Sequence, residues 1–93
     1  MESGLEELME FKGRDVVIDT STPLLYIGRL EDASEHFLVI VECDVHDLAE
    51  GSSTKEVYCI EAKKYGIKKN RRRVMVRRDI IASISLLDDV IEY

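Results

Sequence analysis

Short runs of β-branched and aromatic residues, separated by turn-forming residues, dominate the hydrophobic pattern and predict a mainly β protein. The predicted strands cover residues 14–20, 24–30, 36–44, 56–63, 73–77 and 80–87. Residues 64–72 fit either a loop or the continuation of a long bent strand. Short, regularly spaced strands of this kind predict a small, strongly bent barrel of about five strands.

A short helix is predicted in front of the strands, within residues 1–13. Ser3 and Glu6 fit the capping-box spacing, in which each side chain satisfies a backbone N–H of the first turn. Leu5, Leu8 and Met9 fall on one helical face, which we expect to cover the open end of the barrel. Gly13 is the residue best able to adopt a left-handed conformation after the helix.

Two strands carry further predictions. Gly28 interrupts the second strand, and a glycine there usually marks a bend or the close approach of another backbone. In the third strand, strict alternation would place four residues on one face: Phe37, Val39, Val41 and Cys43.

Composition narrows the class of protein. The 93 residues suffice for one domain, and a 45% hydrophobic share argues against wholesale disorder. No apolar run approaches the roughly 20 residues that cross a bilayer, so we expect no membrane association. The acidic start of the chain is unlike a secretory leader, which predicts a cytoplasmic protein.

The charge is unevenly distributed. Residues 1–62 hold 4 Lys and Arg against 15 Asp and Glu, a net charge of −11. Residues 63–78 hold nine basic residues and no acidic one, and residues 79–93 hold four acidic residues and no basic one. The overall charge of −6 therefore excludes polyanion binding over the whole surface but leaves a local basic site open.

The reactive residues show no catalytic or metal-binding arrangement. Cys43, Cys59, His36 and His46 lack the spacing of zinc ligands, and no nucleophile motif or phosphate-binding glycine loop is present. We therefore expect no enzyme activity, metal or cofactor. The cysteines are predicted to be packed, free thiols on strands, although two strand cysteines at facing positions can also form a disulfide.

Two motifs resemble those of the Sm/LSm family of ribonucleoproteins. Gly28-Arg29-Leu30 matches the glycine-x-leucine of the family's second strand, and Val76-Arg77-Arg78-Asp79-Ile80-Ile81 matches the motif before its last strand. Counting on from Gly28, His36 takes the position of an aromatic residue or histidine, and Leu38 takes that of an asparagine. Gly28, Leu30, Asp79 and Ile81 are the structural members of the two motifs.

The resemblance implies an SH3-like, Sm-type barrel that assembles into a hexameric or heptameric ring and binds single-stranded RNA. It divides the single domain of 1–93 into the helix at 1–13, a barrel at 14–87 with a long variable segment at 44–72, and an acidic tail at 88–93. In the family, a base stacks between the residues that correspond to His36 and Arg77, as an imidazole and a guanidinium both allow. Leu38 lacks the polar group with which the family's asparagine reads the base edge, so uridine specificity is not expected.

The basic run from Lys63 to Arg73 has two readings. As a phosphate-binding strip it would contribute Lys68, Lys69, Arg71, Arg72, Arg73 and, by stacking, Tyr65, beside Arg77 and Arg78 of the second motif. As a solvated face it would only balance acidic neighbours, including those of an adjacent subunit. A nuclear-localisation role would need a eukaryotic source, which nothing in the sequence indicates.

Two functions follow from these readings. The first is a ring-forming homo-oligomer that binds single-stranded RNA. The alternative is an oligomeric scaffold with the Sm fold that has lost RNA recognition, in which the basic run contacts another subunit or an acidic protein. A monomeric SH3-like barrel is a third reading.

Overall fold

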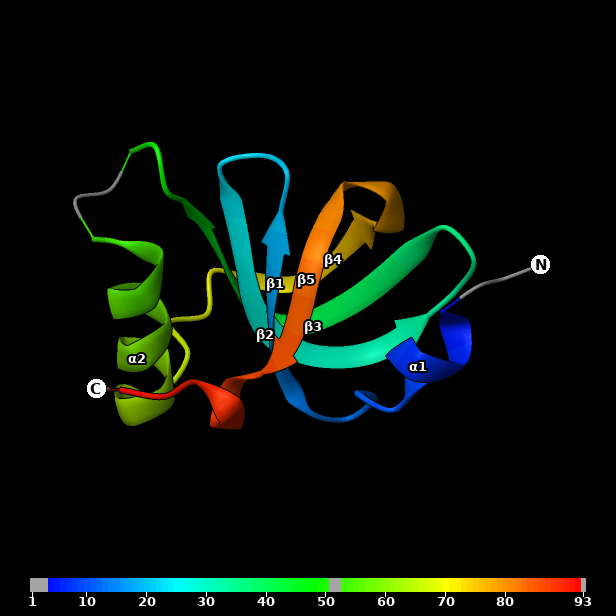
Figure 1. Ribbon diagram of the computed structural model, residues 1–93, viewed down its shortest axis with the longest axis horizontal. Coiled ribbons are helices and arrows are strands. Elements are labelled where there is room, and N and C mark those ends of the chain that lie inside the picture. The colour runs from blue at the N-terminus through cyan, green and yellow to red at the C-terminus, as the bar shows by residue number, and fades with distance from the viewer. Residues whose placement is uncertain (1–3, 51–52, 93) are drawn as a thin grey trace.

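One antiparallel sheet, a short helix at one end and a longer helix at the other make up the computed structural model, which describes residues 4–50 and 53–92 (Figure 1). In chain order the elements are α1 (Leu5–Met9), β1 (Asp15–Thr20), β2 (Leu24–Ala33), β3 (Phe37–Asp47), α2 (Lys55–Tyr65), β4 (Arg71–Arg77), the 3-10 turn η1 (Arg78–Ile80), β5 (Ile81–Leu86) and the 3-10 turn η2 (Leu87–Asp89). The predicted mainly β class with a short N-terminal helix is confirmed.

The five strands are ordered β4-β3-β2-β1-β5, and each neighbouring pair is antiparallel. Consecutive strands from β1 to β4 lie side by side, as sequential strands usually do, whereas β5 pairs with the free side of β1 although only η1 separates it from β4 in the chain. β4 and β5 are the two edges, and in the described residues they do not pair with each other. The sheet is therefore not a closed barrel.

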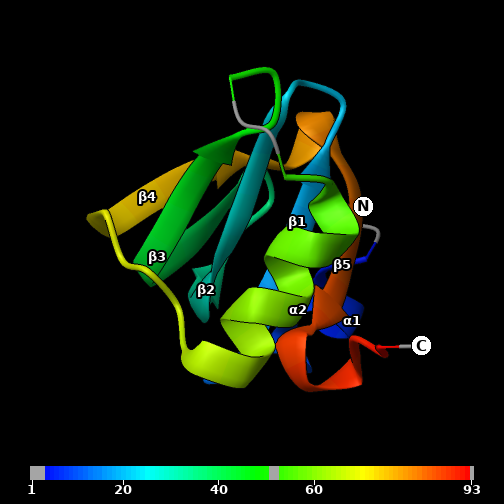
Figure 2. The same cartoon turned by 90° about the vertical axis from the view of Figure 1, so that its left-hand side faces the viewer.

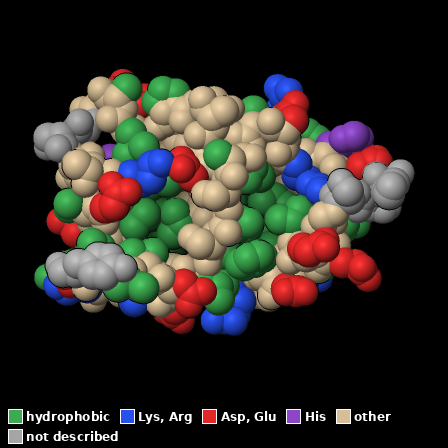
Figure 3. Space-filling view, viewed as in Figure 1, with side chains coloured by type: hydrophobic (Ala, Val, Ile, Leu, Met, Phe, Trp, Pro, Cys, Tyr) green, Lys and Arg blue, Asp and Glu red, His purple; other side chains and the backbone are tan. Residues whose placement is uncertain are grey.

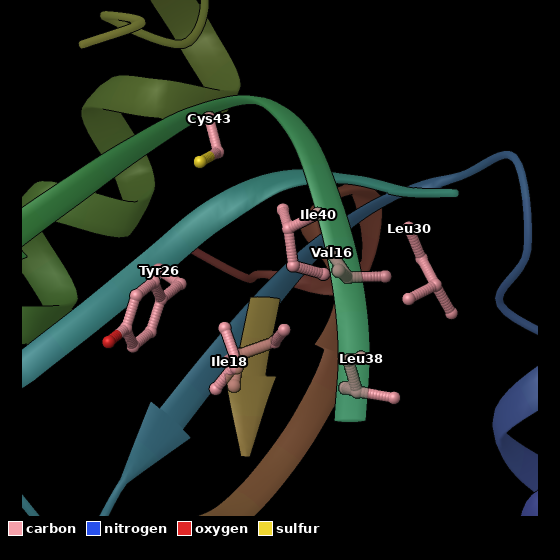
Figure 4. Close-up of a cluster of buried hydrophobic side chains, with 8 residues drawn as sticks. Val16, Ile18, Tyr26, Leu30, Leu38, Ile40 and Cys43 are labelled. Atoms are coloured by element: carbon pink, nitrogen blue, oxygen red, sulfur yellow. The ribbon is translucent and has the colours of Figure 1, made fainter. Parts of the chain in front are cut away.

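One face of the sheet holds the main core. Its buried members come from β1 to β4: Val16, Ile18, Tyr26, Leu30, Leu38, Ile40, Cys43 and Val76. Figure 4 shows these side chains from several strands gathered in one cluster. Gly28 belongs to the same region, and a Cβ placed on it would lie 2.8 Å from Ile40 Cγ2 and closer still to Cys43 Cβ. The prediction that Gly28 permits close approach is confirmed, because any side chain there would overlap β3.

The opposite face is partly covered by α2 and η2 (Figure 2). Cys59 and Ala62 of α2 pack with Val17, Leu25 and Ile27 of the sheet. At the start of the helix, the Lys55 ammonium group donates a hydrogen bond of 2.5 Å to the Asp19 carboxylate, which raises the pKa of Lys55. The helix therefore completes a second apolar layer that β1 and β2 would otherwise expose.

The prediction of a strand over 56–63 is wrong, because these residues form most of α2. Thr54 caps the helix by accepting a hydrogen bond of 3.2 Å from the Val57 N–H, and Gly66 ends it at a φ of 97°. The β propensity of the apolar residues at 57–60 is overcome by these caps and by burial of one helical face. The expected variable segment at 44–72 thus contains the end of β3, a helix and the start of β4.

The prediction that Phe37, Val39, Val41 and Cys43 share one face of β3 is wrong at Cys43. Leu38 and Ile40 are fully buried, whereas Phe37 and Val39 are only partly buried. Glu42 adopts a left-handed φ of 48°, so the alternation shifts by one residue and Cys43 joins the same core. The register between β2 and β3 is irregular opposite this region, where Gly28 lies.

The structure can be compared with some of the predictions for residues 1–13. Ser3 lies outside the described residues, so the capping box stays a prediction. Gly13 has the expected left-handed φ of 83°, and Leu8 packs against the main core together with Phe11. Cys43 and Cys59 are free and buried, but Cys59 lies on a helix rather than a strand. No helix in the described part of the chain has the length and apolar character that a membrane crossing requires.

Candidate nucleic-acid interface

The two sequence motifs meet at one end of the β3–β4 pair. Phe37, which follows His36, is the register partner of Arg77. One residue further on, the Arg78 N–H donates a hydrogen bond of 2.8 Å to the His36 carbonyl. The antiparallel pairing thus brings the predicted stacking residues to the same edge of the molecule.

The side chains at this meeting point are open to solvent. The His36 and Arg77 side chains are 79% and 64% exposed. Each lies near a carboxylate: His36 Nε2 is 3.5 Å from Glu35 Oε1, and Arg77 donates to Asp79 at 2.5 Å. Ion pairs this exposed contribute little free energy, so both side chains remain able to exchange partners.

Arg78 has a structural role in the same place. Its guanidinium group donates hydrogen bonds to the carbonyls of Ser34 at 2.8 Å and Glu35 at 3.0 Å. The side chain therefore fastens the turn between β2 and β3 to η1. The expectation that the Arg78 side chain contributes to the binding strip remains a prediction, since it is seen bonded to these two carbonyls.

The remaining motif residues support the fold. Leu30 and Leu38 are fully buried, and Ile81 packs against the main core at the start of β5. Asp79 lies in η1 and accepts the Arg77 hydrogen bond. Leu38, which the resemblance assigns to the base-reading position, is buried in the core and presents no group to a ligand.

The basic segment occupies the other end of β4. Lys68 and Lys69 precede the strand, Arg71, Arg72 and Arg73 form its first three residues, and all five are exposed. At about 3.3 Å per residue, Arg72 and Arg77 are roughly 17 Å apart along the strand. The candidate residues thus form two groups joined by the edge strand. Tyr65 lies apart from β4, at the end of α2, and is 78% exposed.

Carboxylates partly neutralise the basic group. Lys69 Nζ lies 3.9 Å from Glu42 Oε1, and Arg73 Nε lies 3.8 Å from Glu31 Oε1. These residues, together with Arg72, line a wide and shallow depression on the face opposite the main core. Arg29 of the first motif also lines it, although sequence reasoning gave Arg29 no role. Its position between two buried motif residues would have indicated an outward side chain.

The lysines of α2 are directed elsewhere. Lys63 Nζ donates to the carbonyls of Asp88 at 2.9 Å and Val90 at 2.7 Å, and Lys64 Nζ lies 3.1 Å from Glu92 Oε1. The bond to Glu92 raises the pKa of Lys64. These contacts attach the acidic tail to the helix, so the two lysines are not part of the group on β4.

Neither a metal site among the described residues nor a family match was found for this interface. In residues 4–50 and 53–92, no three His, Cys, Asp or Glu side chains are grouped so as to hold a metal ion. No protein-family model matches the chain, and no curated protein matches it either.

Proposed function

We propose that this chain is an Sm-like, ring-forming subunit that binds single-stranded RNA through the basic segment and a degenerate base pocket. The observation that supports it most is the meeting of the two motifs, in which the Arg78 N–H bonds to the His36 carbonyl. It places two exposed side chains with stacking surfaces, His36 and Arg77, at one end of a basic edge strand. A guanidinium and an imidazole both stack on bases without selecting among them.

The open edges support assembly. β4 and β5 present unpaired backbone groups, which a soluble protein covers or protects. β5 carries no charged residue, and Ala82, Ser83 and Ser85 on it are exposed. The face over β5 in Figure 3 shows apolar side chains with scattered charges. In the proposed assembly the sheet bends into an open barrel, and β4 of one subunit pairs with β5 of the next until a hexameric or heptameric ring closes.

Charge complements this arrangement. All nine charged residues of the segment 63–78 are Lys or Arg, whereas the rest of the chain is strongly acidic. Repeated around a ring, the group on β4 forms a basic belt on an acidic body. RNA is then confined to the belt, and its affinity falls steeply with salt concentration.

The first test is RNA binding by charge-matched variants. The Arg71→Ala/Arg72→Ala variant is compared with Lys12→Ala/Arg14→Ala, which also removes two exposed basic residues but lies near α1. We expect the first pair to weaken binding of short single-stranded RNA and to reduce the salt slope by about 0.7 per lost phosphate contact. Equal effects of both pairs, or no salt-sensitive binding by the wild type, would contradict the proposal.

The second test concerns the pocket and the ring. His36→Ala and Arg77→Ala should each weaken RNA binding, and oligouridine should bind no better than oligoadenosine or oligocytidine because Leu38 is buried. Native mass spectrometry should give six or seven copies. A monomer at micromolar concentration would instead favour the SH3-like reading.

Two observations favour the scaffold alternative. Arg77 is already bonded to Asp79, and no base-reading group replaces Leu38. A scaffold predicts that Arg71→Glu/Arg72→Glu/Arg73→Glu dissociates the oligomer in the absence of RNA. If light scattering shows an intact ring while RNA binding is lost, the RNA-binding function stands and the scaffold reading fails.

A further inference from the structure

A cavity of about 240 Å³ lies between the C-terminal half of α2, β3 and the segment that leads to β4. Its lining does not include His36 or Arg77, whereas Tyr65 and Lys68 also belong to the basic segment proposed to bind RNA. The side chains that give it chemical character are Asp44, Tyr58, Glu61, Tyr65 and Lys68. The insertion of α2 creates this cavity, since the helix supplies three of them.

Asp44 is the most buried polar group of the cavity, with 4% of its surface exposed. Its carboxylate accepts a hydrogen bond from the Tyr58 hydroxyl and one of 2.9 Å from Asn70 Nδ2. An ionised carboxylate has roughly four acceptor sites, so these two bonds leave acceptor capacity beside the cavity. A buried carboxylate with unfilled acceptor sites binds a charged donor more strongly than water or a neutral donor.

The aromatic residues suit a flat cation. The Tyr58 ring is held in place by stacking on His46, with 3.8 Å between ring centroids. Tyr65 stands at the rim, where most of its surface is exposed. Tyrosine rings attract cations through their faces, and guanidinium combines this stacking with bidentate bonding to a carboxylate.

Charge and size select among ligands. Asp44 and Glu61 outweigh Lys68, so the lining has a net charge of −1 and disfavours phosphate or carboxylate ligands. Drug-sized ligands occupy roughly 300–1,000 Å³, so this cavity suits one head group with a short alkyl chain. Guanidinium is more weakly hydrated than ammonium and loses less on entering an apolar site.

We propose that the cavity binds a guanidinium group, carried either by an arginine side chain of another polypeptide or by a small guanidine. Asp44 accepts its N–H groups, Tyr58 and Tyr65 pack against its plane, and Glu61 adds a second negative charge. Lys68 opposes binding electrostatically. Asp44, Tyr58 and Glu61 take no part in the proposed RNA binding, so Glu61→Gln separates the two proposals, whereas Tyr65 and Lys68 belong to both.

The test is an amide NMR titration of the full chain with ethylguanidinium, ethylammonium and uncharged ethylurea. We expect saturable shifts at the Ala62 and Gly66 amides with ethylguanidinium, at least severalfold weaker binding of ethylammonium, and no saturation with ethylurea. Glu61→Gln should weaken ethylguanidinium binding severalfold, and Tyr65→Leu should weaken it about two- to fivefold. Lys68→Ala should strengthen it.

All three substituted residues are exposed, so the variants are expected to fold, and their spectra verify this. Glu56→Gln is the matched control, because Glu56 is exposed on the first turn of the same helix and does not line the cavity. Absence of saturation, equal binding of ethylurea, or weaker binding by Lys68→Ala would overturn the proposal. A blocked Gly-Arg-Gly peptide that binds at least as tightly as ethylguanidinium identifies an arginine side chain as the ligand, and tenfold weaker binding identifies a small guanidine.

Discussion

The hydrogen bond from the Tyr58 hydroxyl to Asp44 offers a sharp test of the packing between α2 and the sheet. Tyr58→Phe removes this donor and leaves the ring in place. Asp44 is 4% exposed, so the only replacement for the lost donor is a water in the adjoining cavity, and among the described side chains only the bond from Asn70 remains. We therefore expect the substitution to destabilise the fold rather than change its shape.

The size of the effect follows from the charge on Asp44. Hydrogen bonds to a charged group contribute about 1.5–3 kcal/mol, about twice the value of neutral ones. A loss of about 2 kcal/mol would lower the Tm of a domain of this length by about 8–16 °C. Tyr65→Phe is the control, because Tyr65 is 78% exposed and its hydroxyl makes no hydrogen bond to any described residue, so its effect should stay below about 0.5 kcal/mol.

The same bond predicts a pH dependence. Burial and the neighbouring Asp44 raise the pKa of Tyr58 above its ordinary value of 10.0. The folded state keeps the phenolic proton where the unfolded chain loses it, so this stabilisation is complete below pH 10 and is lost as the pH rises toward the folded-state pKa. Tyr58→Phe should lack this decline, and its free energy of unfolding should approach that of the wild type in alkali.

Urea unfolding followed by circular dichroism at one fixed protein concentration measures both effects, since any assembly makes stability depend on concentration. A Tyr58→Phe variant within 0.5 kcal/mol of the wild type at pH 7 would refute the reasoning. So would a difference that stays constant from pH 7 to 11.

Three further substitutions test other parts of the structure by urea unfolding. Gly28→Ala should cost about 1–3 kcal/mol because its Cβ overlaps Cys43 and Ile40, whereas Ser85→Ala on β5 should be nearly neutral. Thr54→Ala should cost about 1 kcal/mol and reduce helical ellipticity by removing the cap of α2. Leu38→Asn should cost at least about 3 kcal/mol without creating a uridine preference in RNA binding, because the amide would be buried in the core.

The strands before residue 48 were largely predictable because their determinants are local. β-branched runs specify β1 and the turn residues at 21–23 separate it from β2, so only the ends differ from expectation. The last two strands, β4 and β5, were also predicted from their β-branched residues. Their positions at opposite edges of the sheet were not predictable in this way, because only the short turn η1 joins them and consecutive strands usually pair.

The helix α2 was missed because its central residues favour strands. Val57, Tyr58 and Ile60 have β propensity, and period-two alternation fits the segment. The caps at Thr54 and Gly66 were present in the sequence and would have indicated a helix. The sequence alone does not show that β1 and β2 present an apolar surface. Packing against that surface stabilises the helix by burying one of its faces.

The orientation of β3 was missed for a geometric reason. A single left-handed residue, Glu42, changes which side chains of β3 face the core. A glutamate within a strand gives no sequence signal for a left-handed conformation. Strict alternation therefore grouped Cys43 with Phe37 and Val39, whereas it lies in the main core with Leu38 and Ile40. The error matters for function, because it concerns the strand on which base recognition was sought.

The candidate interface also has a part that was predictable from the sequence and a part that was not. Pairing of Phe37 with Arg77 follows from the antiparallel register, so the meeting of the motifs was predictable, whereas the carboxylates beside the basic residues depend on packing between strands. Since Leu38 lies in the core, the exposed groups of the proposed interface are guanidinium, ammonium and imidazole groups. Such groups bind phosphates and stack on any base, so the proposed interface should recognise RNA by its backbone and not by its sequence.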